Sequence, residues 1–197
     1  MNQKNTIIYF GMGCFTDTDV TVVKQLQKEY SVHWYVLHQP HDPYPVSFYA
    51  DFVKNSGVKL HMLHITNRRR SFKVLELMFK TFTEIVELSP SLIYSCCFDF
   101  YFSLAYLIKA KSIPLVFGVH DVIQHSDNRN SIFYHLSYRF SLFVGDMFLQ
   151  FSSNQNRVFK QLYPKLKSSM VGMSIKDYGE VKGEKHVFNN SNIKILF

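Results

Sequence analysis

Cysteine is scarce in this sequence, and its copies follow no metal-binding spacing. The 3 cysteines are Cys14 and the adjacent pair Cys96 and Cys97. Structural zinc sites need closely spaced cysteines and histidines, and disulfide-stabilised domains need several cysteine pairs. The sequence therefore predicts no metal site and no disulfide framework, and it favours a protein of the reducing cytoplasm.

A secretory signal and a long apolar run are also lacking. The first residues, 1–5, contain no basic segment followed by an apolar stretch. The most apolar window, 92–108, is barely long enough to cross a bilayer, and Asp99 near its middle would cost roughly 3 kcal/mol there. We therefore expect neither a cleaved leader nor a transmembrane helix.

Acidic residues are outnumbered by basic ones. The 15 Asp and Glu residues stand against 22 Lys and Arg residues, which gives a net charge of +7. This charge favours an anionic partner: a membrane surface, a phosphorylated substrate or nucleic acid. The sign of the charge does not choose among them. A content of 47% hydrophobic and 19% charged residues is that of a folded globular protein and excludes a disordered chain.

Short apolar runs alternate with segments of helical periodicity along the chain. Because strands that alternate with helices form βαβ units with right-handed crossovers, the pattern predicts an α/β fold. We expect a Rossmann-like parallel sheet of six or seven strands with helices on both faces. The first helix is capped by one of the residues 17–19. The predicted strands lie at about 5–10, 31–37, 58–64, 91–95, 115–119, 146–151 and 168–173, and the other predicted helices at 46–55, 71–88, 100–109, 132–144 and 155–162.

The end of the chain predicts a second domain. Residues 1–175 hold the Rossmann-like domain, and residues 176–192 are polar and rich in Gly and Asn, as in a linker. Residues 193–197 begin a new apolar strand. We therefore expect the start of a second domain that is truncated after its first residues.

Two candidate sites follow predicted strands. His120 and Asp121 come directly after the buried strand 115–119, and in open α/β sheets ligands bind beyond the carboxyl ends of the strands. The alternative is a core or helix-capping histidine. No serine or cysteine nucleophile motif accompanies the pair, so transfer or binding is favoured over hydrolysis. The residues 152–154, Ser152, Ser153 and Asn154, follow another strand and either cap the next helix or line the cleft.

Gly11 and Gly13 predict a turn after the first strand. Such a turn before a helix can hold a phosphate, since the backbone N–H groups point toward it. The dinucleotide fingerprint is incomplete, because Thr16 stands where a third glycine belongs and no acidic residue ends the second strand at His38. A turn without ligand and a phosphate or sugar contact both remain open.

Basic residues cluster before the third helix. Arg68, Arg69 and Arg70 precede Phe72 and Lys73, and this cluster is either a solvated face or a membrane-facing patch with phenylalanine anchors. No aromatic stacking platform or nucleic-acid motif accompanies the charge, so nucleic acid is not expected as a partner.

Taken in order, these motifs resemble a known family. Their arrangement is similar to the N-terminal half of a GT-B glycosyltransferase, and most of all to retaining family 4. The motifs that carry the likeness are the first strand with its Gly11/Gly13 loop, His120-Asp121 after a buried strand, the strand that leads into 152–154, and the closing segment 170–173. The resemblance implies that the chain binds the acceptor, that a second domain holds a nucleotide-sugar donor, and that His120 contacts the transferred sugar or acceptor.

The resemblance also implies a glycan or lipid-linked acceptor. The residues themselves predict no metal or organic cofactor, and they favour a cytoplasmic location with peripheral contact between the basic cluster and the cell membrane. The paired-glutamate motif and the basic residues that neutralise the donor belong to the second domain and are absent here, so the chain alone is expected to be inactive. The loop also lacks the adjacent glycine pair of many relatives. The alternative is a stand-alone Rossmann-like binding module without catalysis.

Overall fold

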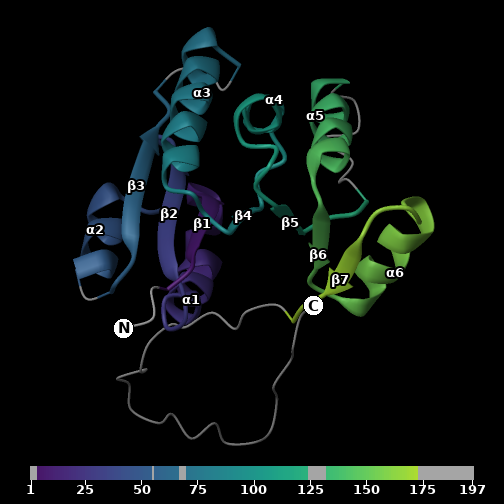
Figure 1. Cartoon of the computed structure of the whole chain (residues 1–197), viewed down its shortest axis with the longest axis horizontal. Coiled ribbons are helices and arrows are strands. Elements are labelled where there is room, and N and C mark those ends of the chain that lie inside the picture. Colours follow the sequence, from purple (N-terminus) through teal and green to yellow (C-terminus); the bar gives the residue numbers. More distant parts are fainter. Residues whose placement is uncertain (1–3, 55, 67–69, 124–131, 173–197) are drawn as a thin grey trace, which may run out of the picture.

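A computed structural model describes residues 4–54, 56–66, 70–123 and 132–172 of the chain (Figure 1). The predicted linker at 176–192 and the predicted second-domain strand at 193–197 lie outside the described residues. Within them the elements are β1 (Thr6–Met12), a 3-10 helix η1 (Gly13–Phe15), α1 (Thr16–Leu26), β2 (Ser31–His38), α2 (Val46–Lys54), β3 (Lys59–His64), α3 (Phe72–Glu87), β4 (Leu92–Ser95), α4 (Phe100–Lys109), β5 (Leu115–Val119), α5 (Ile132–Val144), β6 (Met147–Gln150), α6 (Ser153–Leu162) and β7 (Ser168–Met170).

The strands form one parallel sheet of seven strands in the order β3-β2-β1-β4-β5-β6-β7. β1 lies inside the sheet and pairs with β2 on one side and β4 on the other. A parallel strand that is covered on both faces has an almost continuous apolar sequence. Residues 7–10 of β1 form such a run, and all of them are buried. The predicted Rossmann-like α/β fold is confirmed.

Helices cover the two faces of the sheet in separate groups (Figure 1). The larger core lies between the sheet and α3, α4, α5 and α6, and the smaller core lies between β1, β2 and the pair α1 and α2. The larger core is rich in aromatic rings: Phe82 and Phe102 pack on Phe10, and Phe159 packs on Phe148 with their centroids 5.3 Å apart. None of the helices in the described part is both long and apolar enough to cross a bilayer.

Polar side chains fix the starts of several elements. Asp99 caps α4, because its Oδ1 accepts hydrogen bonds from the backbone N–H groups of Tyr101 and Phe102 at 2.8 and 3.1 Å. Asp146 accepts from the backbone N–H of Leu115 and from Lys111 Nζ, which holds the start of β5 beside the start of β6. The Leu115 N–H and Lys111 lower the pKa of Asp146, although its partial burial acts in the opposite direction.

Two local predictions at the first helix were wrong. Gly11 lies within β1 and not in a turn, and α1 begins at Thr16 with Phe15 before it, so residues 17–19 do not cap it. The buried face of α1 explains the difference: Thr16, Asp19 and Val23 follow helical spacing and all three are buried. Asp19 is therefore a buried carboxyl and not a capping residue.

Candidate functional site

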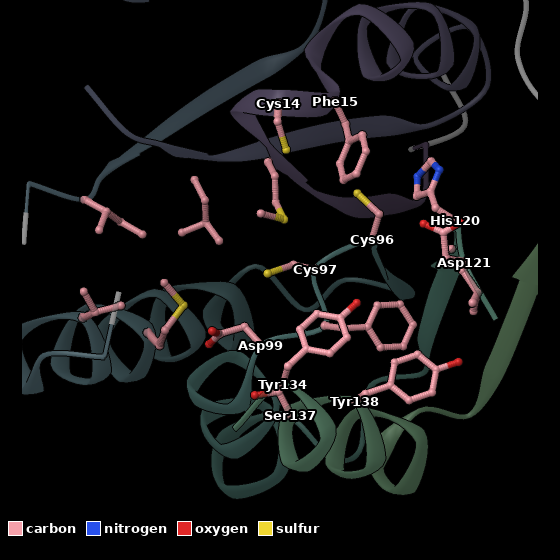
Figure 2. Close-up of a pocket in the computed structure, with 18 of the residues that line it drawn as sticks. Cys14, Phe15, Cys96, Cys97, Asp99, His120, Asp121, Tyr134, Ser137 and Tyr138 are labelled. Atoms are coloured by element: carbon pink, nitrogen blue, oxygen red, sulfur yellow. The ribbon is translucent and has the colours of Figure 1, made fainter. Parts of the chain in front are cut away.

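A cavity of about 330 Å³ opens at the carboxyl edge of the sheet (Figure 2). Its floor comes from the ends of five adjacent strands or the residues after them, and its walls come from α3 and α5. In Figure 2, Cys14 and Phe15 lie across the cavity from Tyr134, Ser137 and Tyr138 of α5. The other lining residues are Met12, Leu37, Ile65, Arg70, Val74, Met78, Cys96, Cys97, Phe98, Asp99, Gly118, Val119, His120 and Asp121.

His120 lies at one end of this cavity, held between two aromatic rings. Its imidazole stacks on Phe15 with the ring centroids 4.5 Å apart and the planes 5° from parallel, and Phe151 lies 4.7 Å away on a tilt. Burial lowers the pKa of His120, and the negative charge of Asp121 opposes that effect only in part. The imidazole is therefore neutral at pH 7, with its ring orientation fixed by stacking.

Asp121 belongs to the same end of the cavity, as the sequence predicted. Asp121 also acts on Tyr134 of α5. Burial raises the pKa of Tyr134, and the negative charge of Asp121 raises it further. The two tyrosines on this wall, Tyr134 and Tyr138, are thus phenols at neutral pH and can act as hydrogen-bond donors. In the described segments, no group of three or more His, Cys, Asp and Glu side chains could hold a metal ion.

Gly11 and Gly13 leave room for carboxylates. A Cβ at Gly11 would lie 2.2 Å from Oδ2 of Asp19, and a Cβ at Gly13 would lie 2.0 Å from Oδ2 of Asp42. The glycines do not line the cavity themselves, although their neighbours Met12 and Cys14 do. A contact between these glycines and a donor phosphate stays a prediction.

The three polar residues after β6 have local partners. Ser152 caps α6, since its Oγ accepts from the backbone N–H of Gln155 at 3.2 Å, and Oδ1 of Asn154 accepts from Arg157 at 2.9 Å. The capping role predicted as one alternative is thus present at Ser152. Ser153 begins the helix, and none of the three lines the cavity. A role for them in a wider cleft stays a prediction.

The basic cluster contacts α5 through Arg70. Arg68 and Arg69 lie outside the described residues, but Arg70 lines the cavity and its guanidinium lies 4.5 Å above the centroid of the Phe133 ring. Phe72 is 86% exposed at the start of α3. The sequence analysis missed that α5 contributes here: Ile132 and Phe133 are also exposed, at 77% and 54%.

A second feature that the sequence analysis missed is the buried Asp19. Its Oδ1 accepts a 2.7 Å hydrogen bond from Tyr9 Oη, while its Oδ2 and Nε1 of Trp34 have no hydrogen-bond partner in the described chain. Burial raises the pKa of Asp19 from 3.8 to about 7, and the bond from Tyr9 acts in the opposite direction. The available signal was its place on the apolar face of α1, three residues after Thr16.

Several solved structures share the fold. UDP-GlcNAc 2-epimerase from Neisseria meningitidis bound to UDP-GlcNAc aligns with a TM-score of 0.58 and 14% identity, over 85% of this chain and 46% of that one. MurG of Acinetobacter baumannii gives 0.56 and 13%, over 88% and 46%. The apo form of the lipopolysaccharide outer core galactosyltransferase WaaB gives 0.54 and 13%, over 85% and 45%. No protein-family profile and no curated protein matches the sequence.

These likenesses establish the fold. The chain spans less than half the length of these three proteins. At 13 to 14% identity they do not assign the chain to a family, and the resemblance to retaining family 4 stays a prediction. The chain has the same Rossmann-like α/β fold as these three proteins.

Proposed function

We propose that this chain is the acceptor-binding domain of a retaining GT-B glycosyltransferase, which transfers a sugar from a nucleotide-sugar to a glycan or lipid-linked acceptor. The observation that carries the proposal is the cavity at the carboxyl edge of the sheet with His120 held at one end. In open α/β sheets this edge is where ligands bind. The solved epimerase with the same fold is bound to UDP-GlcNAc, which supports a nucleotide-sugar as the donor class.

The residues at this end suit a polar substrate group. A neutral imidazole donates a hydrogen bond from one ring nitrogen and accepts one at the other, so His120 can orient an acceptor or donor hydroxyl without adding charge. Asp121 can accept a further hydrogen bond. The diphosphate that leaves the donor carries the developing negative charge, and groups on a second domain would stabilise it. The acceptor hydroxyl then attacks the same face of the sugar that the diphosphate leaves: its oxygen bonds to the sugar, the bond from the sugar to the diphosphate breaks, and the hydroxyl proton passes to the departing diphosphate.

A titration with nucleotide-sugars tests whether this chain binds the acceptor and a second domain binds the donor. It is run on this chain and on a longer polypeptide that contains a second Rossmann-like domain after it. We expect binding only by the longer polypeptide, because the donor site belongs to the second domain. Tight binding of UDP-GlcNAc by this chain alone would contradict the proposal, and binding by neither polypeptide would favour a stand-alone module without catalysis.

Contact with an anionic membrane is part of the proposal. Replacing Arg68, Arg69 and Arg70 with glutamine should weaken binding to vesicles that contain phosphatidylglycerol at least fivefold at low salt, because the cluster loses three positive charges next to the exposed Phe72. The difference should shrink as salt screens the charges. Co-sedimentation with vesicles measures it, and the triple lysine variant is the matched control. Unchanged binding of the glutamine variant would make the cluster a solvated face.

A further inference from the structure

We propose that the acceptor carries a hydrocarbon chain, such as an isoprenoid or acyl chain, and that this chain lies in the cavity with the acceptor's head group at the His120 end. The inference rests on the proposed function for the role of the head group. Four features of the cavity carry it: its length, its lining, the exposed residues beside it and the position of its polar groups.

The cavity is long. Ile65 follows β3, Leu37 ends β2, Met12 ends β1, Cys97 follows β4 and Val119 ends β5, and all five line it. These strands are neighbours in the order β3-β2-β1-β4-β5. Since adjacent strands lie about 4.8 Å apart, the row of lining residues is about 19 Å long. A volume of about 330 Å³ spread over such a row makes a narrow trench, which suits a chain better than a compact ring.

The trench is apolar along most of its length. Val74 and Met78 of α3 form one wall and are 6% and 1% exposed, and Phe98 packs against Phe117 and Tyr138 on the other side. Besides His120 and Asp121, the polar lining residues are Arg70, Asp99, Tyr134, Ser137 and Tyr138. The Oδ1 of Asp99 already accepts the two capping bonds of α4. A sugar chain placed against the Val74 and Met78 wall would lose hydrogen bonds to water without replacing them there, whereas a hydrocarbon chain has none to lose.

Exposed apolar side chains stand beside the trench. Phe72 lies two residues from Arg70 and Val74, which line the trench, and Phe133 precedes Tyr134, which also lines it. Scattered exposed apolar residues are ordinary, but here they gather at the starts of the two helices that form the walls. The segment α5, residues 132–144, contains no acidic residue. A hydrocarbon chain that leaves a lipid surface would meet these side chains before it enters the trench.

His120 and Asp121 lie at one end of the trench, and their position sets the direction. His120 and Asp121 stand at the β5 end, and Leu37 and Ile65 stand at the β2 and β3 end. The acceptor hydroxyl therefore lies near His120 and the hydrocarbon chain extends toward Ile65. This arrangement brings the reactive group to the edge where the proposed second domain would present the donor.

Calorimetric titration of this chain with n-decyl maltoside, kept below the concentration at which it forms micelles, tests the inference. Maltose has the same head group without the hydrocarbon chain. We expect decyl maltoside to bind at least tenfold more tightly than maltose, with a negative heat-capacity change, because apolar surface is buried. Equal binding of the two compounds would overturn the proposal.

Variants locate the bound chain. Ser137 lines the trench on α5, and Ser137→Phe should fill the trench and weaken decyl maltoside binding at least tenfold, while Ser137→Ala should change it less than twofold. Cys14→Trp is a second filling variant at an exposed lining position, for use if the first fails to fold. Phe143→Ser removes a phenylalanine that is 73% exposed and does not line the trench, and it should have no effect. Binding that is lost in Phe143→Ser and kept in both filling variants would place the compound on the outer surface and refute the proposal.

The two proposals can fail separately. The calorimetric experiment contains no nucleotide-sugar, so its outcome does not depend on transfer. If decyl maltoside binds in the trench but the longer polypeptide neither binds a nucleotide-sugar nor transfers one, the proposed function fails while the hydrocarbon site stands. If transfer occurs to maltose and decyl maltoside with equal efficiency, the proposed function stands and the hydrocarbon site fails.

Discussion

Replacing Asp19 with asparagine should stabilise the protein increasingly as the pH rises, by about 3 kcal/mol more at pH 8 than at pH 5. Burial raises the pKa of Asp19 from 3.8 to about 7. Between these two values the folded protein keeps the proton that the unfolded chain has released. The free energy of unfolding therefore falls by about 1.4 kcal/mol for each pH unit until the pH passes the folded value. An amide at position 19 does not titrate and removes this loss.

Urea denaturation at pH 5, 6, 7 and 8 measures the effect. The asparagine can still accept the hydrogen bond from Tyr9, so the geometry at Oδ1 is retained. Asp51→Asn is the matched control: it makes the same chemical change at an exposed side chain that pairs with Lys54 at the surface, where such a pair contributes little to stability. A constant difference between Asp19→Asn and the parent from pH 5 to pH 8 would show that Asp19 does not titrate in this range.

Under the proposed function, replacing His120 with alanine should lower sugar transfer by the longer polypeptide at least tenfold without unfolding it. The alanine removes the ring nitrogens at the polar end of the cavity and the aromatic contact to Phe15 and Phe151 together. His120→Phe separates the two effects, since phenylalanine can keep the stacking while it lacks the nitrogens. We expect the same loss of transfer in both variants, with the phenylalanine variant as stable as the parent.

Transfer rates and thermal denaturation together decide the role of His120. His135→Ala is the control, because this histidine of α5 is exposed and does not line the cavity. Burial holds the pKa of His120 below 6.5, so transfer that depends on the neutral ring should be constant across neutral pH and fall only in acid. Full activity in His120→Phe would mean that the ring acts by packing alone and that its nitrogens take no part in transfer.

The sequence predicted the fold well because periodicity reports burial. The strand at 115–119 and the helix at 132–144 were placed with the bounds that β5 and α5 have in the structure. The first strand was cut short at residue 10, because Gly11 was interpreted as part of a turn. Glycine is present there since the carboxylate of Asp19, eight residues later, occupies the space of its Cβ. Local patterns cannot show such a tertiary contact.

The candidate site was predicted in part. The position of His120 and Asp121 follows from a rule of topology, and both line the cavity. No local pattern indicates that Phe15 stacks on His120 or that α5 forms a wall, because both depend on how distant elements pack. Gly11 and Gly13 were candidates for a phosphate or sugar contact, and the serines after β6 for a cap or a place in the cleft. In the structure the glycines face carboxylates and Ser152 caps a helix.

The central place of β1 has a consequence for synthesis on the ribosome. β1 is made almost first, but its partner β4 lies 85 residues later, as the bond between Ser91 and Thr6 shows. Until residue 95 has left the exit tunnel, one edge of β1 has no neighbouring strand to pair with. The first half of the nascent chain therefore passes through a period in which β1, a strand whose residues 7–11 are all buried in the folded protein, has an open edge. Folding of the sheet can be completed only after the second half begins to appear.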